Sequence, residues 1–126
     1  MKKIYVVWLW LFVSTGFAAP NIQVFLSFSV PNHLMEETLK ESSQLNIPVY
    51  FNGLYRDSMP ETARKIMALS RDIPNLNVQI DPTLFERFGI QQVPALVVDN
   101  GQDFDVIYGN LSIKEGLSRM TYQGNR

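Results

Sequence analysis

The chain has 126 residues, of which 46% are hydrophobic, and 11 Lys and Arg side chains against 12 Asp and Glu side chains leave a net charge of -1 at pH 7. This length fits one domain, the apolar fraction is too high for a disordered chain, and the small net charge speaks against nucleic-acid binding by bulk charge. The absence of cysteine excludes disulfides, thiolate nucleophiles and zinc-thiolate sites within these residues.

Residues 1–18 have the pattern of a cleaved signal peptide. Two lysines near the start precede the uninterrupted apolar run Ile4–Val13, and small or polar residues follow it. A membrane-spanning helix needs roughly 20 apolar residues, so this run is too short for a stable span. Gly16 and Ala18 supply the small residues that a signal peptidase reads. We therefore predict cleavage after Ala18 and one exported domain over residues 19–126, with an uncleaved anchor as the alternative.

The first part of this domain has a strand-helix-strand pattern. Asn21–Phe28 is apolar at nearly every position, as in a strand buried on both faces. Pro31 ends that strand and suits the first turn of a helix over Leu34–Leu45, which carries one apolar stripe among charged residues. Ile47–Phe51 is a second short apolar run and predicts a second strand.

A second helix begins after Ser58, which forms a capping box with Glu61. Pro60 lies in the first turn of this helix, where its missing N–H costs nothing. The spacing predicts a solvated face of Arg64, Lys65 and Arg71 and an inner face of Ala63, Ile66, Met67 and Ser70.

A third strand, Asn77–Ile80, is followed by a short helix over Pro82–Phe88. We interpret Asp81 as its N-cap, Pro82 as its first residue and Gly89 as its C-terminal cap. A carboxylate that follows a strand also lies where α/β sheets bind ligands, so ligand binding is the alternative role of Asp81. The apolar residues expected to form the core beneath this helix are Phe85, Phe88 and Ile90.

The end of the chain predicts a hairpin and a terminal helix. Ala95–Val98 and Phe104–Tyr108 flank an Asn-Gly pair, the strongest short-range hairpin pattern. Ser112 opens a capping box for a helix that extends to about Met120. Strands separated by helices require parallel crossovers whereas a hairpin is antiparallel, so the sheet must be mixed. The acidic residues expected to be solvated around the hairpin are Asp99, Asp103 and Asp105.

This order of elements, with Val93-Pro94 directly before the first hairpin strand, resembles the thioredoxin fold. The resemblance implies an α/β domain in which Pro94 is cis and faces the loop Ser27–Asn32, where redox relatives carry a Cys-x-x-Cys motif. Without the resemblance, a trans proline that begins an edge strand is the alternative. Redox chemistry of that kind is excluded because no sulfur stands at either place.

Two longer segments, Phe25–Pro31 and Gln79–Val98, resemble the TrbC family of F-type conjugative transfer, and the stretch IDPTLFERFGIQQVP is the specific part. The resemblance implies a non-enzymatic pilus-assembly protein of the bacterial periplasm, part of a type IV secretion apparatus, that binds a TraW-like partner. Pilin is a further possible partner. Val30 stands where the family more often has Met, and the extra N-terminal region of many members is absent here. If other members bind their partner through that region, either this domain docks directly or its partner supplies the missing part.

The candidate binding residues are Ser29, Val30, Pro31, Val93 and Pro94. A cis-proline leaves the backbone groups of the preceding residue free to pair with an extended segment. This favours a peptide-binding chaperone as the alternative function. The other interpretation is that these residues are a structural feature of the fold, covered by other side chains and without a binding role.

A serine hydrolase is the third hypothesis, and it requires Ser29 and the single histidine, His33. A serine nucleophile needs a base within hydrogen-bond reach and a third group that orients the base. No G-x-S-x-G elbow is present. One histidine without cysteine also disfavours a transition-metal site, and the acidic residues of the hairpin lack the spacing of a calcium loop. We expect no cofactor, no metal and no catalytic residue.

Overall fold

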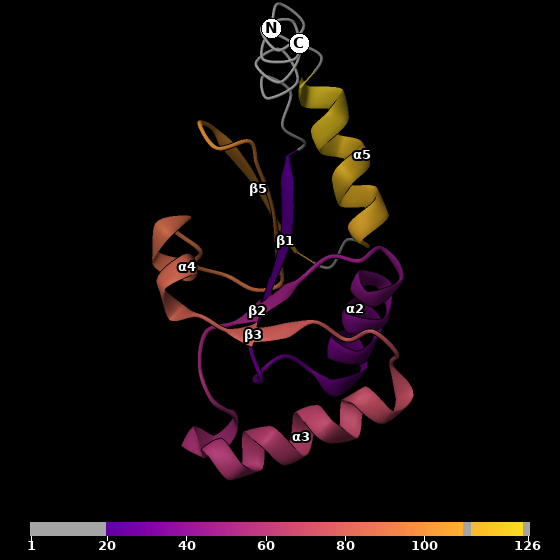
Figure 1. Ribbon diagram of the computed structural model, residues 1–126. Coiled ribbons are helices and arrows are strands. Elements are labelled where there is room, and N and C mark those ends of the chain that lie inside the picture. The colour runs from indigo at the N-terminus through magenta and orange to yellow at the C-terminus, as the bar shows by residue number, and fades with distance from the viewer. Residues whose placement is uncertain (1–19, 110–111, 125–126) are drawn as a thin grey trace, which may run out of the picture.

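The computed structural model describes residues 20–109 and 112–124 (Figure 1). The predicted signal peptide, residues 1–18, and the predicted first residue of the exported domain lie outside these ranges. No helix among the described residues has both the length and the apolar character needed to cross a bilayer.

A five-stranded mixed sheet forms the centre of the molecule, in the order β3-β2-β1-β4-β5. The first three strands are parallel, and β4 is antiparallel to both β1 and β5, which confirms the predicted combination of crossovers and a hairpin. The strands are β1 (Asn21–Leu26), β2 (Val49–Phe51), β3 (Val78–Ile80), β4 (Ala95–Asp99) and β5 (Phe104–Tyr108).

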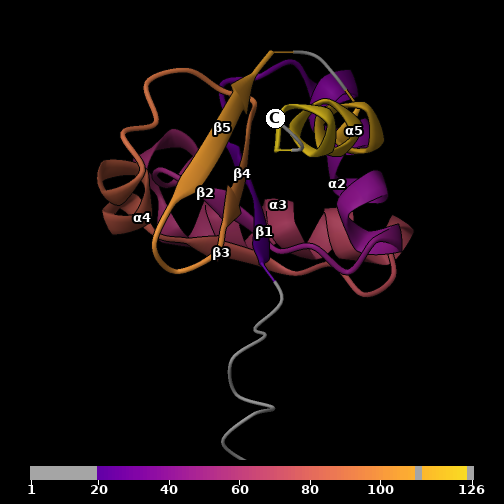
Figure 2. The same ribbon diagram turned by 90° about the horizontal axis from the view of Figure 1, so that it is seen from above.

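Helices cover the two faces of this sheet unequally. Figure 2 shows α4 on the opposite side of the sheet from α2 and α5. The residues of α3 that are packed against the core join the same cluster as those of α2 and α5, so one face carries three helices and the other carries one short helix. The helices are α2 (Asn32–Gln44), the 3-10 turn η1 (Tyr55–Asp57), α3 (Met59–Asp72), α4 (Pro82–Arg87) and α5 (Ile113–Gly124).

The alternation of side chains along β1 divides the core into two clusters. Val24 and Leu26 point toward α2 and α5, whereas Phe25 points toward α4 and is completely buried. The ring centroid of Phe25 lies 4.9 Å from that of Phe85 and 5.9 Å from that of Phe88. The prediction that both phenylalanines of the short helix are core residues is confirmed.

The predicted ends of α4 are confirmed as well. Asp81 Oδ1 accepts the N–H of Leu84 at 3.3 Å. At the other end Gly89 has φ of +63°, and the N–H of Ile90 donates to the Phe85 carbonyl at 2.9 Å. This is the bond that closes a Schellman motif, which requires a residue with positive φ at the position of the glycine.

The hairpin forms as the Asn-Gly pair predicts, but one of its acidic residues is not solvated. Asn100 Oδ1 accepts the N–H groups of Gln102 and Asp103 at 2.9 and 2.7 Å. Asp99 is only 8% exposed, and its Oδ1 accepts the N–H of Gly101 at 2.9 Å. The expectation that Asp99 is solvated is therefore wrong, because its carboxylate folds inward to satisfy the backbone of the turn.

The prediction of which residues form the inner face of α3 is wrong in large part. Ala63 and Ser70 are exposed, Met67 is 58% exposed and Ile66 is half-buried, whereas Thr62 is 1% exposed. The Thr62 hydroxyl bonds to the turn before the helix and holds this residue inward. The face toward the sheet is therefore rotated away from the apolar stripe that the sequence suggests.

Candidate functional site

The carboxyl ends of the parallel strands β1 and β2 border a hollow of about 450 Å³. Open α/β sheets bind ligands at such strand ends, since the loops that follow neighbouring parallel strands meet there. The hollow is lined by Ser27, Phe28, Ser29, Asn52, Gly53, Leu54, Tyr55 and Arg56.

Aromatic rings form one wall of this hollow. The strand β1 ends at Leu26, two residues before its predicted end at Phe28, and the Phe28 ring stacks on the Phe51 ring of β2 with 4.2 Å between the ring centroids. The Tyr55 ring packs beside the Phe28 ring, with 5.7 Å between their centroids, and the Lys65 ammonium lies 4.8 Å from the centroid of the Tyr55 ring. The wall is thus apolar at its base and carries a cation on its outer side.

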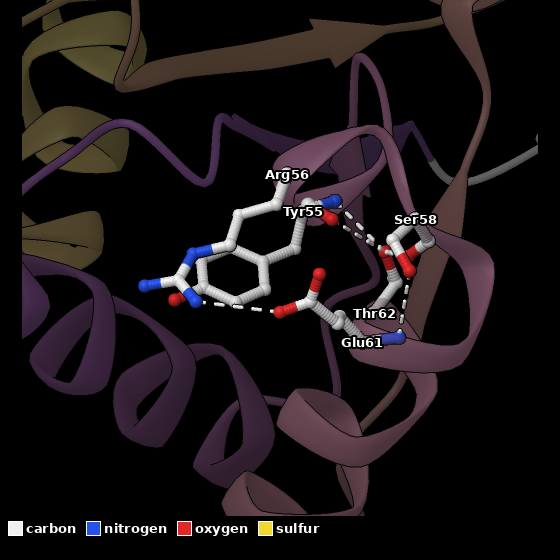
Figure 3. A network of polar contacts seen from close by, with 5 residues as sticks. All are labelled: Tyr55, Arg56, Ser58, Glu61 and Thr62. Atoms are coloured by element: carbon white, nitrogen blue, oxygen red, sulfur yellow. Dashed lines mark hydrogen bonds and ion pairs between the residues drawn. The ribbon is translucent and has the colours of Figure 1, made fainter.

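A network of hydrogen bonds fixes the turn that forms the other wall (Figure 3). The Tyr55 N–H donates to Thr62 Oγ1 at 2.8 Å, and that hydroxyl donates to the Ser58 carbonyl at 2.6 Å. Ser58 Oγ accepts the N–H of Glu61 at 3.2 Å, so the predicted N-cap of this helix is confirmed. The second bond of the capping box does not form, because the Ser58 N–H donates to the Tyr55 carbonyl and the Glu61 carboxylate pairs with Arg56 at 3.3 Å.

The network holds two residues in an unfavourable backbone conformation. Arg56 and Asp57 both have φ of +53°, in the left-handed region that residues other than glycine rarely adopt. Each such residue costs roughly 1–3 kcal/mol and persists only where the surrounding structure holds it. This turn is not predicted from the sequence, because no glycine or asparagine stands at either position to indicate it.

The five candidate binding residues lie in different surroundings. Ser29 lines the hollow, whereas Pro94 lines a separate cavity of about 180 Å³ between α2 and the start of α5. Val30 packs against the core on the α2 side and Val93 against the core on the α4 side. Pro31 precedes α2, and the Val93–Pro94 bond is cis as the resemblance implies. Neither of these two hollows is lined by all five residues.

The groups required by the hydrolase hypothesis have other hydrogen-bond partners. His33 Nε2 lies 3.0 Å from Glu37 Oε1, and the two side chains are 86% and 64% exposed. Ser29 Oγ lies 2.8 Å from Ser27 Oγ. The described residues contain no group of three or more His, Cys, Asp or Glu side chains that could hold a metal. What the hollow offers is hydroxyl groups, aromatic rings and a guanidinium, which suit contact with another polypeptide.

A second feature that the sequence does not predict is the long-range cap on α5. Glu41 on α2 accepts the N–H groups of Ile113 and Lys114 at 2.7 and 3.1 Å, one with each carboxylate oxygen. The predicted cap is also present, since Ser112 Oγ accepts the N–H of Glu115 at 3.1 Å. The carboxylate therefore joins α2 to α5 beside the cavity that Pro94 lines.

Comparison with known proteins gives both a family and a fold. Residues 24–120 match the family described as type-F conjugative transfer system pilin assembly protein. The periplasmic protein TrbC of Escherichia coli (strain K12) is 38% identical over 101 residues, which are 80% of this chain and 48% of that protein. The chain thus spans about half the length of this curated relative.

Solved structures with low sequence identity share the fold. StoA from Bacillus subtilis has a TM-score of 0.54 at 12% identity, covering 82% of each chain. MTB dsbF has a TM-score of 0.53 at 20% identity, covering 82% of this chain and 80% of its own. A putative thiol:disulfide interchange protein DsbE from Chlorobium tepidum has a TM-score of 0.53 at 14% identity, covering 88% and 83%. The predicted thioredoxin-like fold is confirmed, and at these identities the likeness extends to the fold alone.

Proposed function

This chain belongs to the TrbC family of type-F conjugative transfer system pilin assembly proteins, and from that membership we propose that it acts in the periplasm by binding another protein of the transfer apparatus, without turning over a substrate. The observation that carries the proposal is the family match across residues 24–120, which includes nearly the whole folded domain. As the partner we propose a TraW-like conjugative transfer protein.

The chemistry of the domain supports binding over catalysis. Dithiol exchange needs a thiolate, and the chain has no cysteine on its thioredoxin-like scaffold. An activated serine needs a base, and the described hydrogen bond of Ser29 is to Ser27 while His33 pairs with Glu37 at an exposed position. The hydroxyl groups, aromatic rings and guanidinium that line the hollow are suited to contact with another protein.

The experiment is co-expression of this protein with the TraW-like protein encoded nearest to it. Size-exclusion chromatography with light scattering of the purified periplasmic fraction should show a stoichiometric complex. Mass spectrometry of the same complex should find Ala19 as the first residue, as the proposed cleavage after Ala18 requires. If both proteins are folded at micromolar concentration and do not elute together, the proposed partner is wrong.

One substitution separates binding from turnover. The substitution His33→Ala removes the base of the hydrolase hypothesis, and its position is exposed, so the fold should tolerate it. We expect this variant to form the complex and to support pilus assembly at wild-type level. Loss of pilus assembly in this variant while the complex still forms would contradict a function by binding alone.

A further inference from the structure

We propose that the outward flank of α3 is the surface on which this protein receives an acidic amphipathic helix of its partner. The flank, called the Met face below, consists of Met59, Ala63, Met67 and Ser70, and basic side chains border it. The inference deepens the proposed function and rests on it, since it assumes that the protein works by binding another polypeptide.

The first observation is the exposure of large apolar side chains. Met59 is 62% exposed and Met67 is 58% exposed, the two highest values among the exposed large hydrophobic residues of the described chain. Apolar side chains that gather on one exposed surface mark interaction sites more often than scattered ones do. Methionine is flexible and polarisable, and it is favoured at surfaces that must adapt to a binding partner.

The second observation is the direction in which the Met face points. Its four members recur at helical spacing, so they form one stripe along α3. The groove between α3 and α2 is lined on the α3 side by Lys65, Ala68, Leu69 and Asp72, which lie on the other flank of the helix. Thr62 and the C-cap Ile73 are buried, which sets the inward side of α3. The Met face is therefore turned away from α2 and from the core.

The third observation is the distribution of charge around the stripe. Arg64 and Arg71 are exposed on the outer side of the helix, next to the Met face. The carboxylates of α3 lie elsewhere, because Glu61 pairs with Arg56 and Asp72 lines the groove toward α2. Among the residues of α3, the border of the Met face thus carries two cations and no carboxylate. An apolar stripe flanked by Glu or Asp is the complementary ligand.

The shape of the face favours a helix as the occupant. The small residues Ala63 and Ser70 alternate with the two methionines along α3, so a helix that lies against the face can approach closely at the small positions. The 14 residues of α3 give a contact length of about 21 Å, four turns of a partner helix. The hydrogen bonds that fix Tyr55 and Thr62 hold the start of α3 in place before binding, which lowers the entropy lost in docking.

The test compares two synthetic peptides and three variants. The peptides are amphipathic helices of about 20 residues with Leu at helical spacing, one flanked by Glu and the other by Lys. Met67→Glu disrupts the face, Met67→Leu preserves it, and Gln102→Glu adds the same charge at the exposed hairpin. Thermal melting of each variant checks that the domain remains folded. Binding is measured by calorimetry with both peptides and with the TraW-like protein.

We expect the Glu peptide to bind the wild-type protein at least about tenfold more tightly than the Lys peptide, a difference of about 1.4 kcal/mol. Met67→Glu should weaken that binding by tenfold or more, while Met67→Leu and Gln102→Glu leave it unchanged. Equal affinity for the two peptides, no binding of the Glu peptide, or unchanged binding by folded Met67→Glu would overturn the inference.

The TraW-like protein separates this inference from the proposed function. If the wild-type protein and Met67→Glu form the complex equally well, the Met face is not the docking surface, and the proposed function stands. If the wild-type protein forms no complex, the proposed partner is wrong, and the comparison of the two peptides still decides whether the Met face binds an acidic helix.

Discussion

Replacing Thr62 by Val should release the turn that forms one wall of the hollow. Valine has nearly the same shape as threonine and lacks the hydroxyl, so the substitution removes the acceptor of the Tyr55 N–H and the donor to the Ser58 carbonyl. A buried donor left without its acceptor costs about 1–3 kcal/mol. Because Tyr55 is only partly buried, water can reach its N–H in part, and we expect the lower half of that range.

The assay for this prediction combines global and local stability. A loss of about 1 kcal/mol lowers the melting temperature of a domain of about 100 residues by about 4–8 °C, which calorimetry resolves. Amide hydrogen exchange measures the turn itself, and the Tyr55 amide should exchange roughly tenfold faster in Thr62→Val.

Thr62→Ser is the matched control, because it keeps the hydroxyl and loses one methyl group, worth about 0.8 kcal/mol. Both variants should therefore be less stable, but only Thr62→Val should accelerate exchange of the Tyr55 amide. If that amide exchanges at the wild-type rate in Thr62→Val, or equally fast in both variants, the hydroxyl does not hold the turn.

Two further substitutions test the core and the long-range cap. Phe85→Ala should lower the free energy of unfolding by about 3–5 kcal/mol, because the ring is 5% exposed and packs edge-on against Phe25. Urea denaturation measures this loss. A change below about 1 kcal/mol would contradict the packing. Glu41→Ala should lower the free energy of unfolding by about 0.5–2 kcal/mol and accelerate exchange of the Ile113 amide. Glu41→Gln keeps one acceptor oxygen and should lower it by less. Equal exchange rates of the Ile113 amide in both variants would show that the carboxylate is not the cap.

Features determined by neighbouring residues could be predicted from the sequence. The N-caps Ser58 and Asp81 each accept an N–H from three residues further along the chain, so the pattern that predicts them contains both partners. The hairpin at Asn100 is equally local, since its side chain bonds two and three residues ahead. The mixed orientation of the strands followed from crossover and hairpin rules and required no knowledge of side-chain contacts.

Features that depend on distant residues could not be predicted in this way. Glu41 caps a helix that begins 72 residues later, and no local pattern distinguishes it from the solvated glutamates of α2. The left-handed pair Arg56 and Asp57 is held by Thr62, whose role becomes visible only when the turn folds back on the helix. The buried Asp99 was missed for another reason: its bond to the Gly101 N–H is local, but the hairpin pattern does not specify the direction of its carboxylate.

The error on α3 has a different physical origin. Periodicity reports where apolar residues recur on a helix, and it does not distinguish a face that contacts the protein's own core from one that contacts another chain. On α3 these faces are adjacent: Thr62 is buried, and Met67 is 58% exposed on the outward flank. In a protein without a partner, selection for solubility would favour polar residues at Met59 and Met67. Places where local patterning and the fold disagree are where function is expected, and here the disagreement falls on the Met face.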